Sequence, residues 1–294
     1  MKPGVFGYHR AESVADAVSV LADSGGDAKV LAGGQSLLPL LAMRMSRPSL
    51  LVDLGDLPEL ALKRFNDQEM VIGAMTTHRA VETDPRVRAW CPAIADGVSL
   101  IGHAAIRNRG TVGGSVAHGD AAAEWPALCL LLDAVVVARS PRGERRIPVA
   151  DFFHGFLTTA LEEDELLTAV HLRVPGPREG SAFEELARRS GDYAIVGVGA
   201  RVSVDDVGVV STARLVLTGV ASAPHRAAEA EQRLVGQPAD SVDWAAVGEA
   251  VASSIQPPAD LNGDTEYRRQ LSRVLVERAA TTAIRRAQKR TSVA

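Results

Sequence analysis

Hydrophobic positions near the start of the chain recur at helical spacing. After Ser13, apolar side chains return every three or four residues through 14–22, and Gly25-Gly26 follows. Ser13 with Asp16 three residues later resembles a capping box, and a glycine pair commonly ends a helix. The pattern therefore predicts an amphipathic helix that begins after Ser13 and ends at the two glycines.

The next three segments predict a small parallel unit. The apolar runs 29–32 and 50–54 have the length of buried strands. Between them, 37–43 predicts a helix whose early proline is tolerated in the first turn. Strand, helix and strand at this spacing indicate two parallel strands joined by a crossover helix.

The rest of the chain predicts a mixture of strands and helices. Strands are expected at 70–74, 134–138, 166–174, 194–204 and 212–220, and helices at 227–235 and 244–253. Between the third and fourth of these strands, Pro175-Gly176-Pro177 has the strongest linker composition in the chain.

A final helix is expected to begin after Asp264, an N-cap residue. Its apolar face is predicted to comprise Tyr267, Leu271, Val274, Leu275 and Ala279. Four basic side chains close it: Arg285, Arg286, Lys289 and Arg290. Positive charge is favoured at a helix C-terminus, so we interpret this basic cluster as a solvated helix end and not as a binding patch.

Composition indicates how large a core the chain can form and in which cellular compartment the protein is expected. The 294 residues are 46% hydrophobic, enough for a large core and two or three compact units. The 32 basic and 36 acidic residues nearly balance, so no net field favours nucleic acid or anionic lipid. The two cysteines form no metal-binding motif. The first residues of the chain lack the apolar core of a signal peptide, and no apolar run approaches the length of a membrane-spanning helix. We expect a soluble cytoplasmic protein that holds neither an iron–sulfur cluster nor zinc by itself.

Two glycine-containing turns are the best candidates for ligand binding. Gly33-Gly34-Gln35-Ser36 lies between a predicted strand and a predicted helix, and 111–115 repeats the chemistry later, followed by His118, Asp120 and Glu124. Glycines let backbone N–H groups approach an anion, and a helix N-terminus adds partial positive charge. Two separate turns suit a ligand with two phosphates and two distant ends, and the carboxylates suit hydroxyl or ring N–H groups. The alternative is two tight turns flanked by solvated acids, and the pattern alone does not choose between them.

Other site signals are weak. The chain has no GxxxxGK[ST] motif, and Gly197-Val198-Gly199 lies inside an apolar strand candidate without completing GxGxxG. No Ser/His/Asp or Cys/His constellation stands out. Trp125 is interpreted as core packing at the start of a helix. We assign no role to the isolated histidines His78, His103, His154, His171 and His225.

The two turns and their flanks resemble a known family. Residues 31–39 are similar to the first FAD loop of the medium, flavoprotein subunits of molybdenum hydroxylases, and 106–120 to the second. That family includes the medium chains of carbon monoxide, nicotine, caffeine and xanthine dehydrogenases. Segments 188–194 and 263–268 also fit, so the resemblance covers essentially the whole chain.

The resemblance implies an α+β fold in two parts. A two-lobed FAD-binding domain of the PCMH type is expected at 1–176, with lobes at about 1–55 and 56–176. A smaller α+β domain of the CO dehydrogenase flavoprotein C-terminal type is expected at 180–288.

The resemblance also implies which residues contact FAD. The two turns would hold the pyrophosphate through backbone N–H groups. Asp120 and Glu124 would line the adenosine and ribityl side, and Leu167 would contact the adenine end. Tyr193 would lie against the isoalloxazine ring. The full implied set is Leu31, Ala32, Gly33, Gly34, Gln35, Ser36, Leu37, Thr76, Thr77, Ile101, Ala105, Thr111, Val112, Gly113, Gly114, Ser115, His118, Asp120, Glu124, Leu167 and Tyr193.

Four departures from the family pattern stand out. Ala121 follows Asp120 where many relatives have proline, which should loosen that turn slightly. Ser115 replaces a frequent asparagine and Glu124 a frequent aspartate, both keeping an oxygen. Glu184-Glu185 stands where distant relatives carry a lysine near the cofactor, so a positive charge that tunes the flavin is not carried over.

The function implied is electron transfer within a larger enzyme. FAD in this chain would receive electrons from [2Fe–2S] clusters of a small subunit and pass them to an external acceptor. A large subunit with molybdenum and molybdopterin cytosine dinucleotide would hydroxylate the substrate, in a dimer of heterotrimers. No catalytic residue or metal ligand is assigned to this chain. Two alternatives remain: a self-sufficient FAD-dependent oxidoreductase, and a non-catalytic nucleotide-binding scaffold subunit.

Overall fold

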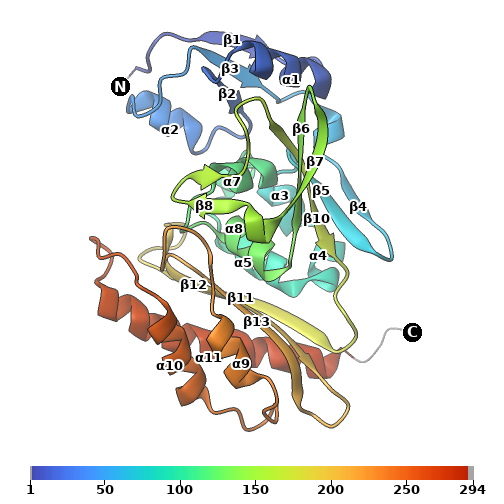
Figure 1. The fold of residues 1–294 in the computed structure, drawn as a ribbon, viewed down its shortest axis with the longest axis vertical. Coiled ribbons are helices and arrows are strands. Elements are labelled where there is room, and N and C mark those ends of the chain that lie inside the picture. The colour runs from blue at the N-terminus through green and yellow to red at the C-terminus, as the bar shows by residue number, and fades with distance from the viewer. Residues whose placement is uncertain (1, 291–294) are drawn as a thin grey trace.

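A computed structural model describes residues 2–290, which form three units stacked along the long axis (Figure 1). The N-terminal unit is a parallel sheet of order β1-β3-β2, in which β1 and β2 each pair in parallel with the central strand β3. Its elements are β1 (Gly7–Arg10), α1 (Val14–Asp23), β2 (Ala28–Leu31), α2 (Leu37–Ala42) and β3 (Leu50–Asp53). The predicted parallel unit is confirmed. The sequence pattern missed β1, because its four residues contain no apolar run.

The first helix begins as the sequence predicts, with one difference. The Asp16 amide donates to the Ser13 hydroxyl at 3.0 Å, which caps α1. The Asp16 carboxylate accepts from the Glu12 amide at 2.9 Å, one residue before the amide that a capping box uses.

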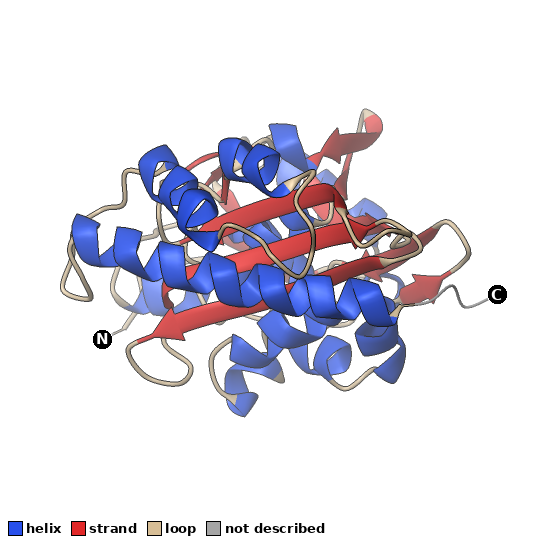
Figure 2. Cartoon of the chain, turned by 90° about the horizontal axis from the view of Figure 1, so that it is seen from below, coloured by secondary structure: helices blue, strands red, loops and turns tan. Residues whose placement is uncertain are grey.

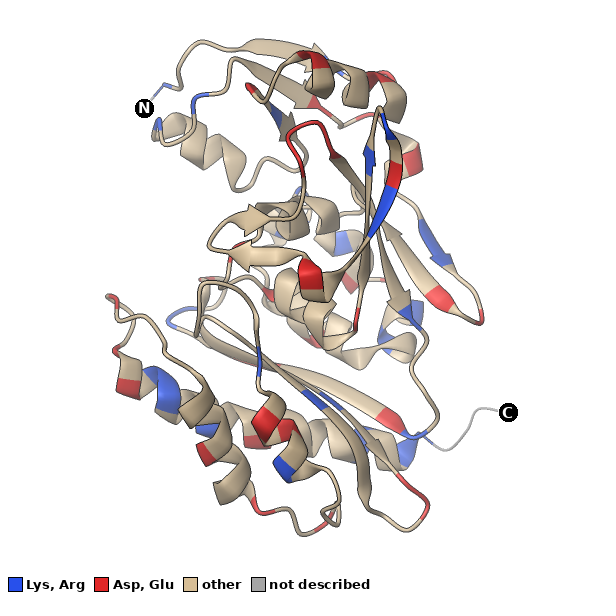
Figure 3. Ribbon diagram, viewed as in Figure 1, with Lys and Arg blue, Asp and Glu red and all other residues tan. Residues whose placement is uncertain are grey.

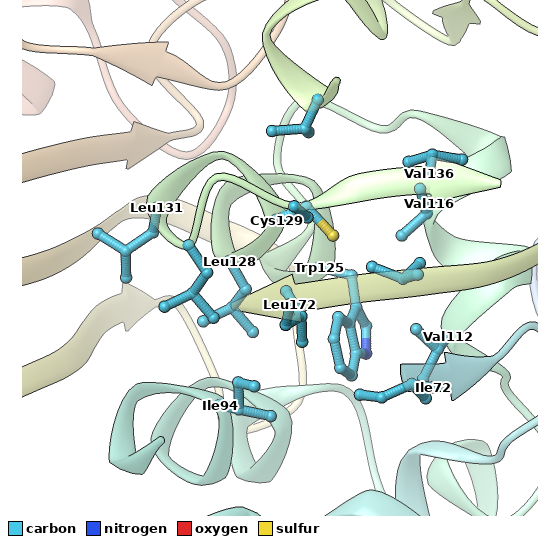
Figure 4. Packing of buried hydrophobic residues seen from close by; sticks show 14 of the residues in the cluster. Ile72, Ile94, Val112, Val116, Trp125, Leu128, Cys129, Leu131, Val136 and Leu172 are labelled. Carbon is cyan, nitrogen blue, oxygen red and sulfur yellow. The ribbon is translucent and has the colours of Figure 1, made fainter. Parts of the chain in front are cut away.

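The middle unit is an antiparallel sheet of order β4-β5-β10-β6-β7, covered by short helices. Its strands are β4 (Lys63–Phe65), β5 (Glu69–Gly73), β6 (Val135–Ser140), β7 (Gly143–Pro148) and β10 (Leu166–Arg173), with β8 (Phe153–Gly155) and β9 (Thr158–Thr159) as a separate pair. Its helices are α3 (His78–Glu82), α4 (Pro85–Trp90), α5 (Pro92–Leu100), α6 (Ala104–Arg107), α7 (Val112–His118) and α8 (Glu124–Leu131), and the 3-10 turns are Pro58–Leu60 and Val149–Asp151. Trp125 is fully buried in the core of this unit, near Ile72, Val112 and Leu172 (Figure 4). This confirms its interpretation as a packing residue.

The C-terminal unit is an antiparallel sheet of order β11-β12-β13-β14 with helices on one face (Figure 2). Its elements are β11 (Glu179–Ala187), β12 (Ala194–Val204), β13 (Val210–Thr218), β14 (His225–Arg226), α9 (Ala228–Leu234), α10 (Trp244–Ser254) and α11 (Thr265–Lys289). The predicted linker at 175–177 joins β10 to β11.

The buried face of α11 differs from the predicted one. Asp264 caps the helix as predicted, accepting from the Tyr267 amide at 2.7 Å. However, Tyr267 is 45% and Val274 37% exposed. The buried residues of the helix are Arg268, Ser272, Leu275, Val276, Ala279, Ala280, Ala283, Ile284 and Ala287. Small side chains occupy this face because the helix lies very close to β11: a Cβ on Gly180 would stand 2.0 Å from the Ala283 carbonyl oxygen.

The interpretation of the basic cluster as a solvated helix end is also wrong in part. The Arg286 guanidinium donates to the Asp96 carboxylate at 2.5 Å and to the Ser181 carbonyl at 2.7 Å. Arg290 donates to the Trp90 carbonyl at 3.3 Å. These two side chains tie α11 to helices of the middle unit. Basic and acidic residues are otherwise spread along all three units of the chain (Figure 3).

Membrane insertion by a helix has no candidate in the part of the chain described. No helix within residues 2–290 combines the length and the apolar character that crossing a bilayer requires.

Candidate functional site

A cavity of about 730 Å³, which we call the inter-unit cavity, is lined by all three units. The N-terminal unit contributes the first glycine turn, and the middle unit contributes the second turn with the residues that follow it. The C-terminal unit contributes the loop Gly191-Asp192-Tyr193. Of the implied FAD-contacting set, the lining contains Ala32, Gly33, Gly34, Gln35, Ser36, Leu37, Ile101, Thr111, Gly113, Gly114, Ser115, His118, Asp120, Glu124, Leu167 and Tyr193.

The two glycine turns touch each other on the wall of this cavity. A Cβ on Gly33 would lie 2.1 Å from the Arg109 carbonyl oxygen and 2.7 Å from the Gly110 Cα. Atoms this close cannot coexist, so glycine at position 33 allows the two backbones to meet. The structure thus brings the two turns together although they are far apart in the sequence.

The first turn presents free backbone donors. It connects β2 to α2, and Gly34 has φ +72°, a conformation that favours glycine. Ser36 precedes α2 but its side chain does not cap the helix. Within residues 2–290, no carbonyl or side chain accepts from the amides of Gln35 and Ser36. These N–H groups are open to a ligand at the start of α2.

The second turn differs, because its amides from Val112 to Ser115 already have partners. The N–H groups of Val112 and Gly113 donate to the carbonyls of Thr76 and Ala74, at 3.0 and 2.8 Å. The Gly114 amide donates to the Thr111 hydroxyl at 3.1 Å, so Thr111 caps α7. A Cβ on Gly113 would stand 2.5 Å from that of Ala74. The glycines of this turn serve close packing, whereas free amide donors come mainly from the first turn.

Five residues of the implied set lie behind the wall or beside it and do not line the cavity. Leu31 ends β2, and Thr76 and Val112 are buried and joined by the hydrogen bond above. Thr77 caps α3 and forms a β-bridge with Thr111. Ala105 is exposed on α6. Except for Ala105, these residues support the two turns from behind.

Carboxyl groups gather at the end of the cavity near α8. Asp120 accepts from the Ala122 amide at 2.9 Å. Glu124 is only 6% exposed, and its burial together with Asp120 raises its pKa to about 7. Burial and the neighbouring Glu124 raise the pKa of Glu185 to about 8, and one oxygen of Glu185 is buried without a partner. Near neutral pH this pair therefore retains protons, and a protonated carboxyl group can donate as well as accept hydrogen bonds.

Tyr193 reaches across from the C-terminal unit. Its side chain is 58% exposed at the cavity, where its hydroxyl group faces that of Ser36 in the first turn. Local burial and Asp120 raise its pKa. A half-exposed aromatic ring beside a cavity is suited to stacking on a flat ligand.

His78 is a lining residue that sequence reasoning missed. It is 4% exposed, its amide donates to the Gly110 carbonyl at 2.9 Å, and its ring Nδ1 lies 3.0 Å from Trp125 Nε1. The available signal was its position directly after Thr76-Thr77, the pair that the family resemblance had marked as cofactor-contacting.

The arrangement fits an extended dinucleotide such as FAD. The volume lies within the usual range of ligand pockets. Free amides at a helix start suit a diphosphate, carboxyl groups suit hydroxyl and ring N–H groups, and Tyr193 offers an aromatic face. The glycines leave the wall without side chains where the two turns meet.

Comparisons with known proteins place the whole chain. Residues 4–175 match the family described as the FAD binding domain in molybdopterin dehydrogenase, and residues 181–283 match the CO dehydrogenase flavoprotein C-terminal domain. The chain is 43% identical, over 98% of its length and 97% of the relative's, to the 6-hydroxypseudooxynicotine dehydrogenase complex subunit alpha of Paenarthrobacter nicotinovorans. It is 40% identical, over 98% of its length and 99% of the relative's, to the carbon monoxide dehydrogenase medium chain of Afipia carboxidovorans.

The fold is shared with solved structures of such enzymes. A chain of the reconstituted CO dehydrogenase from Oligotropha carboxidovorans superposes with a TM-score of 0.94 at 38% identity, covering 97% of this chain and 100% of that one. The predicted fold class is thereby confirmed. Together with the sequence matches, this shows that the chain belongs to the family of FAD-binding medium subunits of molybdenum hydroxylases, each the FAD subunit of an oxidoreductase complex.

Proposed function

We propose that this chain carries FAD in the inter-unit cavity and serves as the electron-transfer subunit of a three-subunit enzyme. A small subunit with [2Fe–2S] clusters supplies the electrons, and an external acceptor receives them. A large subunit with molybdenum and molybdopterin cytosine dinucleotide oxidises the substrate, and the complex is a dimer of heterotrimers in the cytoplasm. The FAD-binding domain spans 1–176, with lobes at about 1–55 and 56–176, and the C-terminal domain spans 180–288.

The observation that carries this proposal is the meeting of the two glycine turns. Gly33 of the first turn packs on the backbone of Arg109 and Gly110, which lead into the second turn. Both turns line one cavity that also receives Tyr193 from the C-terminal unit. A single extended ligand can therefore contact all three units.

In this proposal the chain's residues bind and orient the cofactor. Bound FAD supplies the redox chemistry, exchanging electrons one or two at a time. The free amides of Gln35 and Ser36 hold the diphosphate, Asp120 and Glu124 bind hydroxyl or ring N–H groups, and Tyr193 covers the ring system. The remaining members of the implied set other than Ala105, from Leu31 to Leu167, complete or support the binding surface.

Two further observations support a division of labour between subunits. Within residues 2–290, no group of three or more His, Cys, Asp or Glu side chains is arranged to hold a metal ion. The relatives carry the printed names medium chain or complex subunit. Metal centres are thus expected on partner chains.

One purification tests the assignment. The chain, tagged and isolated under native conditions with its partners, should contain flavin, iron and molybdenum together. Isolation of a flavin-containing chain alone that turns over a small organic substrate would instead support a self-sufficient enzyme. A colourless chain would support a non-catalytic scaffold.

A matched pair of variants tests the cavity itself. Gly34 and Gly208 both have positive φ, +72° and +84°, so valine strains the backbone at either position. Gly34 lies in the first turn, whereas Gly208 lies on the β12–β13 turn with open space around it. Gly34→Val should yield flavin-free protein and Gly208→Val should retain FAD. Full FAD content in Gly34→Val would refute the assignment of the first turn.

A further inference from the structure

His78 occupies a buried position between the core and the second glycine turn. Its side chain lies among lining residues of the inter-unit cavity although the residue is only 4% exposed. One edge of the ring faces Trp125, with 3.0 Å between Nδ1 and the indole Nε1. The other edge faces Gly110: a Cβ on Gly110 would lie 2.9 Å from Nε2 and 2.8 Å from Cδ2.

Trp125 determines which ring nitrogen of His78 carries the proton. The indole N–H can only donate, so Nδ1 must accept and is therefore unprotonated. Burial, with a smaller contribution from Arg107, lowers the pKa of His78 to about 4. The imidazole is thus neutral at physiological pH, and its single proton is on Nε2.

The Nε2–H group has no acceptor within the chain. No residue among 2–290 accepts a hydrogen bond from Nε2; the ring's one hydrogen bond there is the bond from Trp125. Nε2 is not one of the buried side-chain atoms that lack a partner within residues 2–290, and His78 lines the inter-unit cavity. Its N–H group is therefore open to the cavity and free to donate to whatever occupies it.

The cavity has few other donors for a diphosphate at this point. The amides of the second turn from Val112 to Gly114 are already paired within the chain. Among residues 2–290, Lys29 is the one lysine or arginine that lines the cavity. Its acidic lining residues are Asp120, Glu124, Glu162, Glu163, Glu165 and Asp192. An uncharged donor next to the contact between the two turns adds to the few hydrogen-bond donors on this side of the cavity.

We propose that His78, held by Trp125 as the Nε2–H tautomer, is a cofactor-binding residue that donates a hydrogen bond to an oxygen of the FAD diphosphate segment. This inference rests on the proposed function, since it presumes FAD in the inter-unit cavity. It adds to that function a second residue, Trp125, which acts through His78 by positioning and not by contact.

Two substitutions of His78 test the acceptor at Nδ1 and the donor at Nε2 separately. His78→Asn keeps an acceptor near the δ position for Trp125 and loses the ε donor. His78→Gln places an amide N–H near the ε position. FAD affinity of the full chain, freed of flavin and titrated by quenching of flavin fluorescence, should fall about tenfold in His78→Asn, the equivalent of one lost hydrogen bond. His78→Gln should recover a clear part of that loss.

The stability of the flavin-free variants distinguishes binding from a structural role. The flavin-free form of His78→Asn should melt close to the parent, because the Trp125 bond is kept. Equal loss of affinity in both variants, in proportion to lowered melting temperature, would overturn the inference and leave a packing role. So would unchanged affinity in His78→Asn. If the parent chain itself bound no FAD, the proposed function would fail first, and the two failures are thus distinguishable.

The tautomer can be observed directly. In ¹⁵N spectra of the imidazole-labelled full chain, His78 should show an unprotonated Nδ1 and a protonated Nε2 throughout pH 6–8, roughly the range over which an unperturbed histidine titrates. Trp125→Phe removes the indole donor and should produce a mixture of the two neutral tautomers, while burial keeps the pKa of His78 low. The opposite tautomer in the parent would refute the role assigned to Nε2.

Discussion

Replacing Gly33 by alanine tests the contact on which the inter-unit cavity depends. The added methyl group would lie 2.1 Å from the Arg109 carbonyl oxygen and 2.8 Å from its carbonyl carbon. Both neighbours are backbone atoms, so no side chain can rotate away. Gly33 does not have positive φ, and the expected effect is therefore steric, without backbone strain.

The magnitude follows from that distance. Real Cβ atoms essentially never come within 3.0 Å of such a neighbour, so the two turns must separate by roughly 1 Å. Overpacking of this kind costs about 1–3 kcal/mol, which lowers the melting temperature by about 2–5 °C for a chain of this size. A shift of that size also misaligns the amides of Gln35 and Ser36. Losing one or two hydrogen bonds to a charged group, at about 1.5–3 kcal/mol each, weakens FAD binding at least tenfold.

The assay compares Gly33→Ala with Gly155→Ala, in which the new Cβ meets nothing within 4 Å. Flavin content after purification, FAD affinity by fluorescence and melting temperature with and without FAD are measured on both. Gly33→Ala should lose affinity and stability, whereas the control should keep both. Parent-like FAD affinity in Gly33→Ala would refute the idea that close contact of the two turns forms the binding surface.

Three further outcomes are expected. Because the pKa of Glu124 is raised in the folded chain to about 7, its contribution to stability is present below its unfolded pKa and is lost as pH rises to about 7. In urea unfolding, the flavin-free Glu124→Gln variant should therefore be more stable than the parent by up to about 3 kcal/mol at pH 8 and by little at pH 5. A difference in stability that does not change with pH would contradict this. Arg286→Met removes the hydrogen bonds to Asp96 and to the Ser181 carbonyl and should lower the free energy of unfolding by about 2 kcal/mol. The control Arg285→Met, at an exposed position, should change that free energy by less than about 0.5 kcal/mol. Equal effects of the two substitutions would exclude a stabilising link from Arg286 to the middle unit. The thiols of Cys91 and Cys129 are buried and free, and burial raises the pKa of Cys129 to about 12. A thiol reagent should therefore label neither cysteine in the native chain and both after denaturation. Rapid labelling of the native chain would contradict this and show that the core opens.

Local patterns in the sequence predicted much of the secondary structure and the position of the first turn. The capped start of α1, the β2–turn–α2 connection and the Asp264 cap depend on neighbours within a few residues. Such features are recorded in residue spacing, because hydrogen bonds and side-chain faces there repeat with the local backbone. The short helices α3 to α6 escaped prediction, since four to nine residues carry too little periodicity. The face of α11 was misjudged because the largest apolar side chains were taken as the buried ones.

The family resemblance supplied the remaining candidates, and tertiary packing decided what each one does. Gly33 contacts Arg109, and Trp125 meets His78 across 47 positions of sequence. Arg286 reaches Asp96 across 190 positions. No spacing rule encodes these pairs, because they arise where separate elements pack.

Burial, which is also set by tertiary packing, changes the pKa values of side chains. Glu124 has an ordinary sequence context, yet exclusion from water raises its pKa, and the same effect lowers the pKa of His78. Sequence by itself determined that this protein has two glycine turns and a family; only the folded chain decided that the turns touch, which amides remain free and where a neutral histidine points. The physical reason is that solvent exclusion and contact between distant segments are properties of the packed structure, whereas residue patterns report mainly on local geometry.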